Sequence, residues 1–396
     1  MTLVKEGLNM KEYEDVLIYT PGPVNVPQRV LAAGAQSMIH HRSAEFSAIL
    51  IDLIAKLRWL FNTKAVPLLI HTSGRGAMEG TILNLFSRGD KIISVCNGRF
   101  GEMYAEIATN YGLNVVTFCE DWEKDLSPEE LEKAIIQNPD AKAVTLCHGD
   151  TSTARLIDIP PITAMAKKHG LLTLVDCVST AGCIPIDFDS WNADVIVTAS
   201  QKGLMSPTGL SIAFLSEAAW KHADTSALGK FYIDFKDIRA HLEAAKPETP
   251  GSTPVSLIRS LNEALSMMQE EGREAIFARH AKLACAVRAG LTEMGMTLFP
   301  VECKARSNAL TTFIPPDGVS PGAIKNGLKE QFGIMIAGGL GSYTNSTLRA
   351  AHMGYFYSRD ALLLVSAMET VLNRILSRKA SGKGIAACMD LLSGRS

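Results

Sequence analysis

The segment LLTLVDCVSTAGCIPIDFDSWNADVIVTASQKGLMSPTG, residues 171–209, holds two short apolar runs that each lead directly to a charged side chain. Asp176 follows the first run, and Lys202 lies just beyond the second. Apolar runs of this length, separated by helical patterns, are typical of a parallel sheet that helices cover on both faces. Because ligands bind beyond the carboxyl ends of the strands in such sheets, we expect Asp176 and Lys202 to face one crevice.

The same alternation extends outward from this segment. The strand-like runs AVPLLI, KIISVC, LNVVTF and KAVTLC alternate with helical patterns from about residue 66, and LSIAFL follows Lys202. The string SPEE at residues 127–130 predicts a helix start, with a capping serine and a proline in the first turn. The pattern predicts an α/β fold built on a large, mostly parallel sheet.

The βα rhythm changes towards the C-terminus. A long helical stretch runs from about Leu257 to Gly290, followed by the strand patterns ALTTFIP and GIMIAGG and by a final helix over ALLLVSAMETVLNRIL. We therefore predict a large α/β domain over residues 1–275, whose N-terminal segment packs near the site, and a smaller α+β domain over residues 276–396.

Composition excludes several classes of partner. The 396 residues carry a net charge of -2 and contain no basic run, so nothing in the sequence would attract nucleic acid or an anionic membrane. The eight cysteines are scattered without a C-x-x-C pair, as is typical of reduced thiols, and the charged N-terminus does not resemble a secretory signal. We predict a cytoplasmic protein without a metal site.

The string TSGRG at residues 72–76 connects a strand to a helix and so predicts an anion site, most simply for a phosphate. A tight turn without a ligand and a dinucleotide-binding loop are the alternatives. The dinucleotide pattern requires a third glycine where Glu79 stands, and no P-loop occurs in the chain, which argues against a nucleotide-binding α/β protein.

Asp176 and Lys202 each have an ordinary alternative. Asp176 could cap the next helix, and Lys202 could be a solvated surface group. A carboxylate at the end of a buried strand is costly unless it is paired, and a protonated pyridine nitrogen would be a suitable partner. A desolvated lysine in the same crevice can form a Schiff base with an aldehyde. Phe100 could stack on such a ring and Thr151 could donate to its hydroxyl, although each could also serve only packing or a turn.

Taken together, these strings resemble class V aminotransferases of pyridoxal 5'-phosphate (PLP) fold type I, especially the alanine–glyoxylate and serine–pyruvate branch. The resemblance runs from TPGPVNVP at Thr20 to Gly354. It implies PLP as cofactor, Lys202 as the Schiff-base lysine and Asp176 as the partner of the ring nitrogen. The other roles that it implies fall to Gly22 near the substrate, to Ser73, Gly74 and Arg75 at the phosphate, to Phe100 and Val178 around the ring, and to Gln201 beside the lysine.

The resemblance also implies a homodimer with the site at the subunit interface, in which Ser252 and Thr253 of GSTPVSL close the phosphate site of the other subunit. The string LRAAHMG places Arg349 where the family holds the arginine that binds the substrate carboxylate. A guanidinium fork matches a carboxylate with two parallel hydrogen bonds, although the residue alone would be interpreted as a surface arginine.

These features predict an aminotransferase that moves an amino group from a small amino acid to glyoxylate or pyruvate with ping-pong kinetics. One arginine, with no second basic residue evident, favours small monocarboxylic substrates. Arg75 and the tail SGKGIAACMDLL are similar to the ureidoglycine–glyoxylate and pyridoxamine–pyruvate aminotransferases, which stay open as alternatives. A cysteine desulfurase-like lyase is less favoured, because Gln201 precedes the lysine and Cys303 lacks a matching context. A silent binding or regulatory protein is disfavoured by the intact Asp176 and Lys202.

Overall fold

A seven-stranded sheet forms the centre of the N-terminal part in the computed structural model, which describes residues 16–119 and 121–394. The strand order is β2-β8-β7-β6-β5-β3-β4. The strands are β2 (Leu68–Ile70), β3 (Lys91–Val95), β4 (Asn114–Phe118), β5 (Ala141–Cys147), β6 (Leu172–Asp176), β7 (Val195–Ala199) and β8 (Ser211–Leu215). Every predicted run is a strand, and the expected large, mostly parallel sheet is confirmed.

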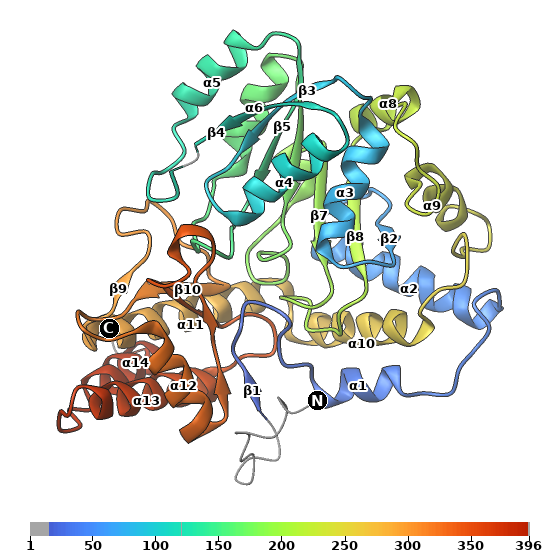
Figure 1. The fold of residues 1–396 in the computed structure, drawn as a ribbon. Coiled ribbons are helices and arrows are strands. Elements are labelled where there is room, and N and C mark those ends of the chain that lie inside the picture. Colours follow the sequence, from blue (N-terminus) through green and yellow to red (C-terminus); the bar gives the residue numbers. More distant parts are fainter. Residues whose placement is uncertain (1–15, 120, 395–396) are drawn as a thin grey trace, which may run out of the picture.

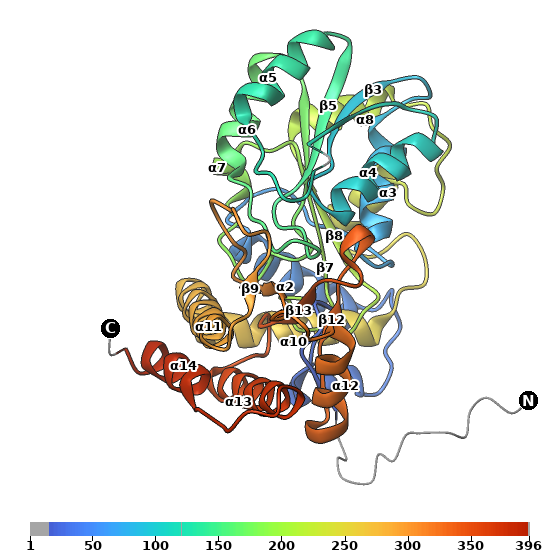
Figure 2. The ribbon, with the colours of Figure 1, turned by 60° about the vertical axis from the view of Figure 1, so that its left-hand side comes forward.

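Helices cover both faces of this sheet, as the apolar strands require (Figures 1 and 2). One face carries α3 (Gly74–Leu85), α4 (Arg99–Asn110) and α8 (Glu217–Thr225). The other carries α5 (Pro128–Gln137), α6 (Ile159–Lys168) and α7 (Phe188–Trp191). The predicted start of α5 is confirmed, because the Ser127 hydroxyl accepts from the Glu130 backbone N–H. This arrangement agrees with the PLP fold type I architecture that the sequence resemblance implies.

One strand runs against the parallel direction. β8 pairs antiparallel with β7 on one side and with β2 on the other. The connection from β7 to β8 is too short for a helical crossover, so the chain must turn back as a hairpin. Lys202 lies in that connection, just past the carboxyl end of β7.

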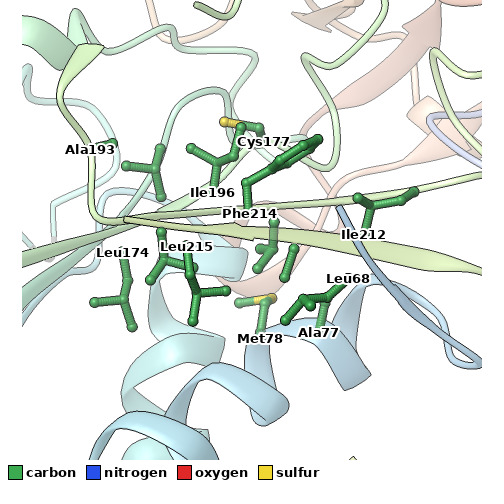
Figure 3. Close-up of a cluster of buried hydrophobic side chains, with 14 of the residues drawn as sticks. Leu68, Ala77, Met78, Leu174, Cys177, Ala193, Ile196, Ile212, Phe214 and Leu215 are labelled. Atoms are coloured by element: carbon green, nitrogen blue, oxygen red, sulfur yellow. The ribbon is translucent and has the colours of Figure 1, made fainter. Parts of the chain in front are cut away.

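The hydrophobic core fills the space between the sheet and its helices. Figure 3 shows Cys177, Ile196 and Phe214 on one side of the strands and Ala77 and Met78, from α3, on the other. All five side chains are buried. Tight packing on both faces fixes where the carboxyl ends of β5, β6 and β7 lie.

Further helices pack below the sheet: α1 (Gln28–Gly34), α2 (Ala44–Leu60), α10 (Val255–Glu271) and α11 (Arg273–Glu293). Helix α9 (Phe235–Leu242) packs beside β2, at the edge of the sheet. The single helix that we predicted from Leu257 to Gly290 is wrong, because α10 and α11 are separate. Gly272 divides them with a φ of +90°, which helical geometry excludes and glycine tolerates.

A second, four-stranded antiparallel sheet organises the C-terminal part, in the order β12-β13-β10-β9. Its strands are β9 (Thr297–Leu298), β10 (Leu310–Ile314), β12 (Ala337–Gly338) and β13 (Leu348–Ala351), and a 3-10 turn, η1 (Gly341–Tyr343), precedes β13. The helices around it are α12 (Pro321–Phe332), α13 (Ser358–Ile375) and α14 (Lys383–Ser393).

The prediction that the helix over residues 361–376 is the last one is wrong, because α14 follows it. Gly290 on α11 and Gly384 on α14 explain the packing of this extra helix. A Cβ atom on either glycine would lie 3.0 Å from the backbone oxygen of the other, so only two glycines let the helices approach this closely.

The N-terminal strand β1 (Leu17–Ile18) pairs in parallel with β11 (Ile334–Met335), and Tyr19 packs in the C-terminal hydrophobic cluster. The charged N-terminal stretch, which we predicted not to be a secretory signal, lies almost entirely in residues 1–15, outside the described residues. Two separate hydrophobic clusters support the division near residue 275, which we keep as a proposal. No helix within the described ranges is both long and apolar enough to cross a membrane.

Candidate active site

A cavity of about 440 Å³ opens beyond the carboxyl ends of β5, β6 and β7. All of the predicted site residues except Ser252 and Thr253 line it. The expectation that Asp176 and Lys202 face one crevice is therefore met. The wall opposite the large sheet comes from the C-terminal part, through Ala337, Leu340 and Arg349.

The loop before α3 presents the start of a helix to this cavity. Ser73 precedes α3 in an extended conformation, and its side chain makes no capping hydrogen bond. At Gly74 a Cβ atom would lie 2.8 Å from Val178, so the loop could not pack this closely with any larger residue. The free N–H groups and the helix dipole favour an anion at this position.

Arg75, in the first turn of α3, adds a positive charge to the same end of the helix. No carboxylate among the described residues forms an ion pair with it. A cation at a helix N-terminus is unfavourable unless an anion lies nearby. Arg75 therefore strengthens the anion preference of the loop.

Asp176 ends β6 and is buried. Its Oδ1 accepts from the Val178 backbone N–H at 2.7 Å, and its Oδ2 accepts from the Cys147 thiol at 3.4 Å. It does not cap a helix, because turns follow it. Burial raises the pKa of the carboxyl, and no cation among the described side chains forms an ion pair with it. A cationic ring nitrogen would remove this unfavourable isolation.

Lys202 is only 7% exposed, so the surface interpretation of this residue is wrong. Its Nζ lies 5.1 Å from the centroid of the Phe100 ring. Gly22, with a φ of +103°, lies against the lysine stem, where a Cβ atom would come within 3.0 Å of Lys202 Cγ. Burial is the main cause that lowers the pKa of the Lys202 amine, which favours the neutral, nucleophilic form.

Asp150, which sequence reasoning missed, connects several of the predicted residues. Its Oδ2 accepts from the backbone N–H groups of Phe100 at 2.7 Å and Gly101 at 3.2 Å, at the start of α4. Its Oδ1 accepts from the Ser152 backbone N–H at 2.8 Å and the Ser152 hydroxyl at 2.6 Å. Asp150 therefore fixes the Phe100 ring and the loop of Thr151 at once. The string HGDTST is typical of a turn, and no local sequence pattern indicates that Asp150 accepts hydrogen bonds from the start of α4.

Arg349 extends from β13 into the cavity and is 9% exposed, which overturns its interpretation as a surface arginine. Its Nε donates to the Gly338 carbonyl at 2.7 Å and its Nη1 to the Thr151 carbonyl at 3.1 Å. Desolvation lowers the pKa of the guanidinium to about 10. It forms no ion pair with a described carboxylate, so its charge is available for an anion from outside the chain.

The expectation that the site lacks a second basic residue is wrong. Arg75 and Arg99 both line the cavity together with Arg349. Arg99 is neutralised by a two-fold contact with Glu106, at 2.9 Å for each nitrogen–oxygen pair. Arg75 is thus the second cation to consider in substrate or cofactor binding.

Ser252 and Thr253 lie apart from this cavity. Thr253 Oγ1 is 2.7 Å from His71 Nε2, and Ser252 lines a second cavity of about 580 Å³ together with Phe231 and Tyr232. Cys303 is not among the cavity residues either, and its thiol donates to the Ala305 carbonyl.

The cavity fits a flat, anionic, ring-containing cofactor such as PLP. Gln201 supplies an independent sign of this, because its Oε1 is buried without a hydrogen-bond partner among the described residues. Asp176, the α3 loop and Lys202 offer the complementary groups for a ring nitrogen, a phosphate and an aldehyde. Within the described ranges, no group of three or more His, Cys, Asp or Glu side chains could hold a metal ion.

A model of the family described as "Aminotransferase class-V" matches residues 25–358. A relative from Synechococcus, described as the small subunit of a soluble hydrogenase, is 38% identical over 96% of this chain and 99% of its own length. The serine–glyoxylate aminotransferase of Methylorubrum extorquens is 30% identical over 95% of each chain. The crystal structure of ureidoglycine–glyoxylate aminotransferase from Bacillus subtilis superposes with a TM-score of 0.90, at 27% identity, over 96% of this chain and 99% of its own.

Proposed function

The chain belongs to the class V aminotransferase family, and from this membership we propose that it is a PLP-dependent transaminase that moves an amino group from a small amino acid to glyoxylate or pyruvate. One observation carries the proposal. Lys202, Asp176 and the N-terminus of α3 share a single cavity, although they lie far apart in the sequence. PLP needs these three groups for its aldehyde, its ring nitrogen and its phosphate.

Each group would have a distinct task. Ser73, Gly74 and Arg75 would hold the phosphate, Phe100 would stack on the ring, and Asp176 would keep the ring nitrogen protonated. When bound, PLP supplies an electron sink and carries the amino group between the two half-reactions. This division of the reaction leads to the expected ping-pong kinetics.

Lys202 would move the proton. Because burial lowers the pKa of its amine, the neutral form that can take the proton from the substrate Cα is favoured. Arg349 would orient the substrate by its carboxylate, and the carbonyls of Gly338 and Thr151 hold the guanidinium before the substrate arrives. Preorganisation of this kind reduces the entropy lost on binding.

The substrate alternatives are open to direct comparison. The B. subtilis neighbour, by its description, acts on ureidoglycine and glyoxylate, and the M. extorquens relative on serine and glyoxylate. Pyridoxamine with pyruvate remains a further pair. The hydrogenase description belongs to the Synechococcus relative, whereas our proposal for this chain rests on Lys202 and Asp176.

We also propose that the working form is a homodimer in which Ser252 and Thr253 complete the partner's phosphate site. Phe231 is 94% exposed and Tyr232 71%, and they adjoin the cavity that holds Ser252. Two adjacent aromatic side chains with this exposure favour contact with another surface. Light scattering should give twice the mass of one chain. A double variant in which Phe231 and Tyr232 are both replaced by Glu should give the mass of a single chain. None of the eight cysteines, all of which the structure describes, forms a disulfide, which supports a reducing compartment such as the cytoplasm.

The decisive experiment is covalent labelling. Purified protein incubated with PLP and reduced with borohydride should carry the label on Lys202, as shown by peptide mapping. Lys202→Ala should carry none and should lose the absorption band of the bound aldehyde form. Label at another lysine in correctly folded protein would overturn the proposal.

A panel of donors then identifies the reaction. Alanine, serine, aspartate, ureidoglycine and pyridoxamine should be tested against glyoxylate and pyruvate. Conversion of the cofactor to its amine form, with reversal by one oxo acid, is the expected result. Sulfide release from cysteine without amino transfer would instead identify a desulfurase.

A further inference from the structure

We propose that Cys147 is a positioning residue whose thiol holds the Asp176 carboxylate and sets how firmly Asp176 retains the ring nitrogen of the cofactor. The inference rests on the proposed PLP site. It assigns a role to a cysteine that takes no part in the chemistry described above.

The sheet places the two side chains together. Cys147 is the last residue of β5 and Asp176 the last of β6, and they are direct partners in the register of this parallel pair. Cys147 Sγ lies 3.4 Å from Asp176 Oδ2. On the other side of Asp176, the strand partner is Val197 of β7, whose side chain has no hydrogen-bond donor. Among the two flanking strand partners, only Cys147 can donate to the carboxylate.

The two oxygens of Asp176 therefore have different environments. A rigid backbone N–H, that of Val178, holds Oδ1 at 2.7 Å. Oδ2 accepts, among the described residues, from the Cys147 thiol, which therefore restrains the rotation of the carboxylate about its last bond. Both residues are buried.

The thiol stays protonated and can donate throughout the physiological range. Burial raises the pKa of Cys147 well above its ordinary value, and the negative charge of Asp176 raises it further. A thiol is a weaker donor than a hydroxyl. It therefore steadies the carboxylate less strongly than a serine at this position would.

Two substitutions vary this one hydrogen bond. Cys147→Val keeps the approximate volume and removes the donor, and Cys147→Ser supplies a stronger one. Removing a donor from the ionised carboxylate raises its pKa, so acid release of PLP should begin at a higher pH in Cys147→Val than in wild type. In Cys147→Ser it should begin at a lower pH. A purely structural role would not give this order.

The sharpest test uses a PLP analogue with carbon in place of the ring nitrogen. In Cys147→Val the dissociation constant for PLP should rise about 5-fold, the usual size of one lost hydrogen bond. For the analogue, which has no ring nitrogen to engage Asp176, the same substitution should change the constant by less than about 2-fold. Cys388→Val, at a buried thiol of the C-terminal cluster, is the matched control and should alter neither constant.

Equal weakening of PLP and of the analogue by Cys147→Val would overturn the inference, since the thiol would then act by packing alone. A failure of Cys147→Ser to bind PLP at least as well as Cys147→Val would also overturn it. If wild-type protein takes up no PLP at Lys202, the proposed function itself is wrong. That outcome is distinguishable from a failure of the Cys147 inference, which requires wild-type protein that binds PLP.

Discussion

The cavity has two walls that are built in different ways. The sheet wall places Asp176 and Lys202 at the ends of neighbouring strands, where the register of the sheet sets their positions. The C-terminal wall presents Arg349, whose guanidinium is held by two backbone carbonyls, one of them from Thr151 of the opposite wall. From this difference we propose that the sheet wall serves cofactor chemistry and that the C-terminal wall serves substrate selection.

The two walls also differ electrostatically. On the sheet wall, a buried carboxyl with a raised pKa lies in the same cavity as a buried amine with a lowered pKa. Burial therefore disfavours the charged form of both groups. On the C-terminal wall, Arg349 carries an unbalanced charge that no described carboxylate neutralises. The first arrangement suits proton transfer, and the second suits the capture of an anion.

The largest expected effect separates the walls. Arg349→Gln should raise KM for the amino and oxo acids about 100-fold, because it removes charge-assisted hydrogen bonds worth about 1.5–3 kcal/mol. The dissociation constant for PLP should change little. Arg75→Gln is the matched comparison, and it should raise the dissociation constant for PLP by a larger factor than it raises KM. Steady-state kinetics gives KM, and a PLP titration gives the dissociation constant. The comparison fails if Arg349→Gln weakens the binding of PLP as much as the binding of the substrate.

A smaller effect is expected where the walls connect. Asp150→Asn places an NH₂ group or a neutral oxygen where the carboxylate now accepts four hydrogen bonds. Because Asp150 fixes both Phe100 and the Thr151 loop, PLP affinity and KM should each worsen about 10-fold.

Asp158→Asn serves as the control for this change. Asp158 precedes α6, is exposed, and makes no side-chain capping bond. It should behave as wild type in both measurements. A change in only one of the two constants for Asp150→Asn would show that Asp150 serves a single wall.

The smallest effect tests the electrostatics of the sheet wall. The lowered pKa of Lys202 means that the folded chain binds fewer protons at this residue than the unfolded chain. The protonated lysine therefore opposes folding at pH 7, and this penalty fades as the pH rises towards 10.5, the ordinary value.

Without PLP, Lys202→Met should thus raise Tm by about 2 °C at pH 7 and by less at pH 10. Calorimetry at several pH values measures the difference. Lys221→Met, at an exposed lysine, should give no such slope. A gain that grows with pH would contradict the assigned direction.

Several structural features were predictable because they depend on neighbours in sequence. The apolar runs and the SPEE start gave correct strands and a correct α5, since periodicity and capping act over a few residues. The break at Gly272 and the helix α14 escaped prediction. A single glycine within a helical pattern is usually tolerated, and the packing of α14 depends on Gly290, which is distant in sequence.

The sequence by itself determined that Asp176 and Lys202 follow buried strands, and so that they point to one edge of the sheet. Only the tertiary structure decided that Asp150 supports Phe100, that Cys147 reaches Asp176, and that Arg349 enters the same cavity from a second sheet. The physical reason is range: strand and helix patterns repeat within a few residues, whereas these contacts join residues tens to hundreds of positions apart and exist only once the layers have packed.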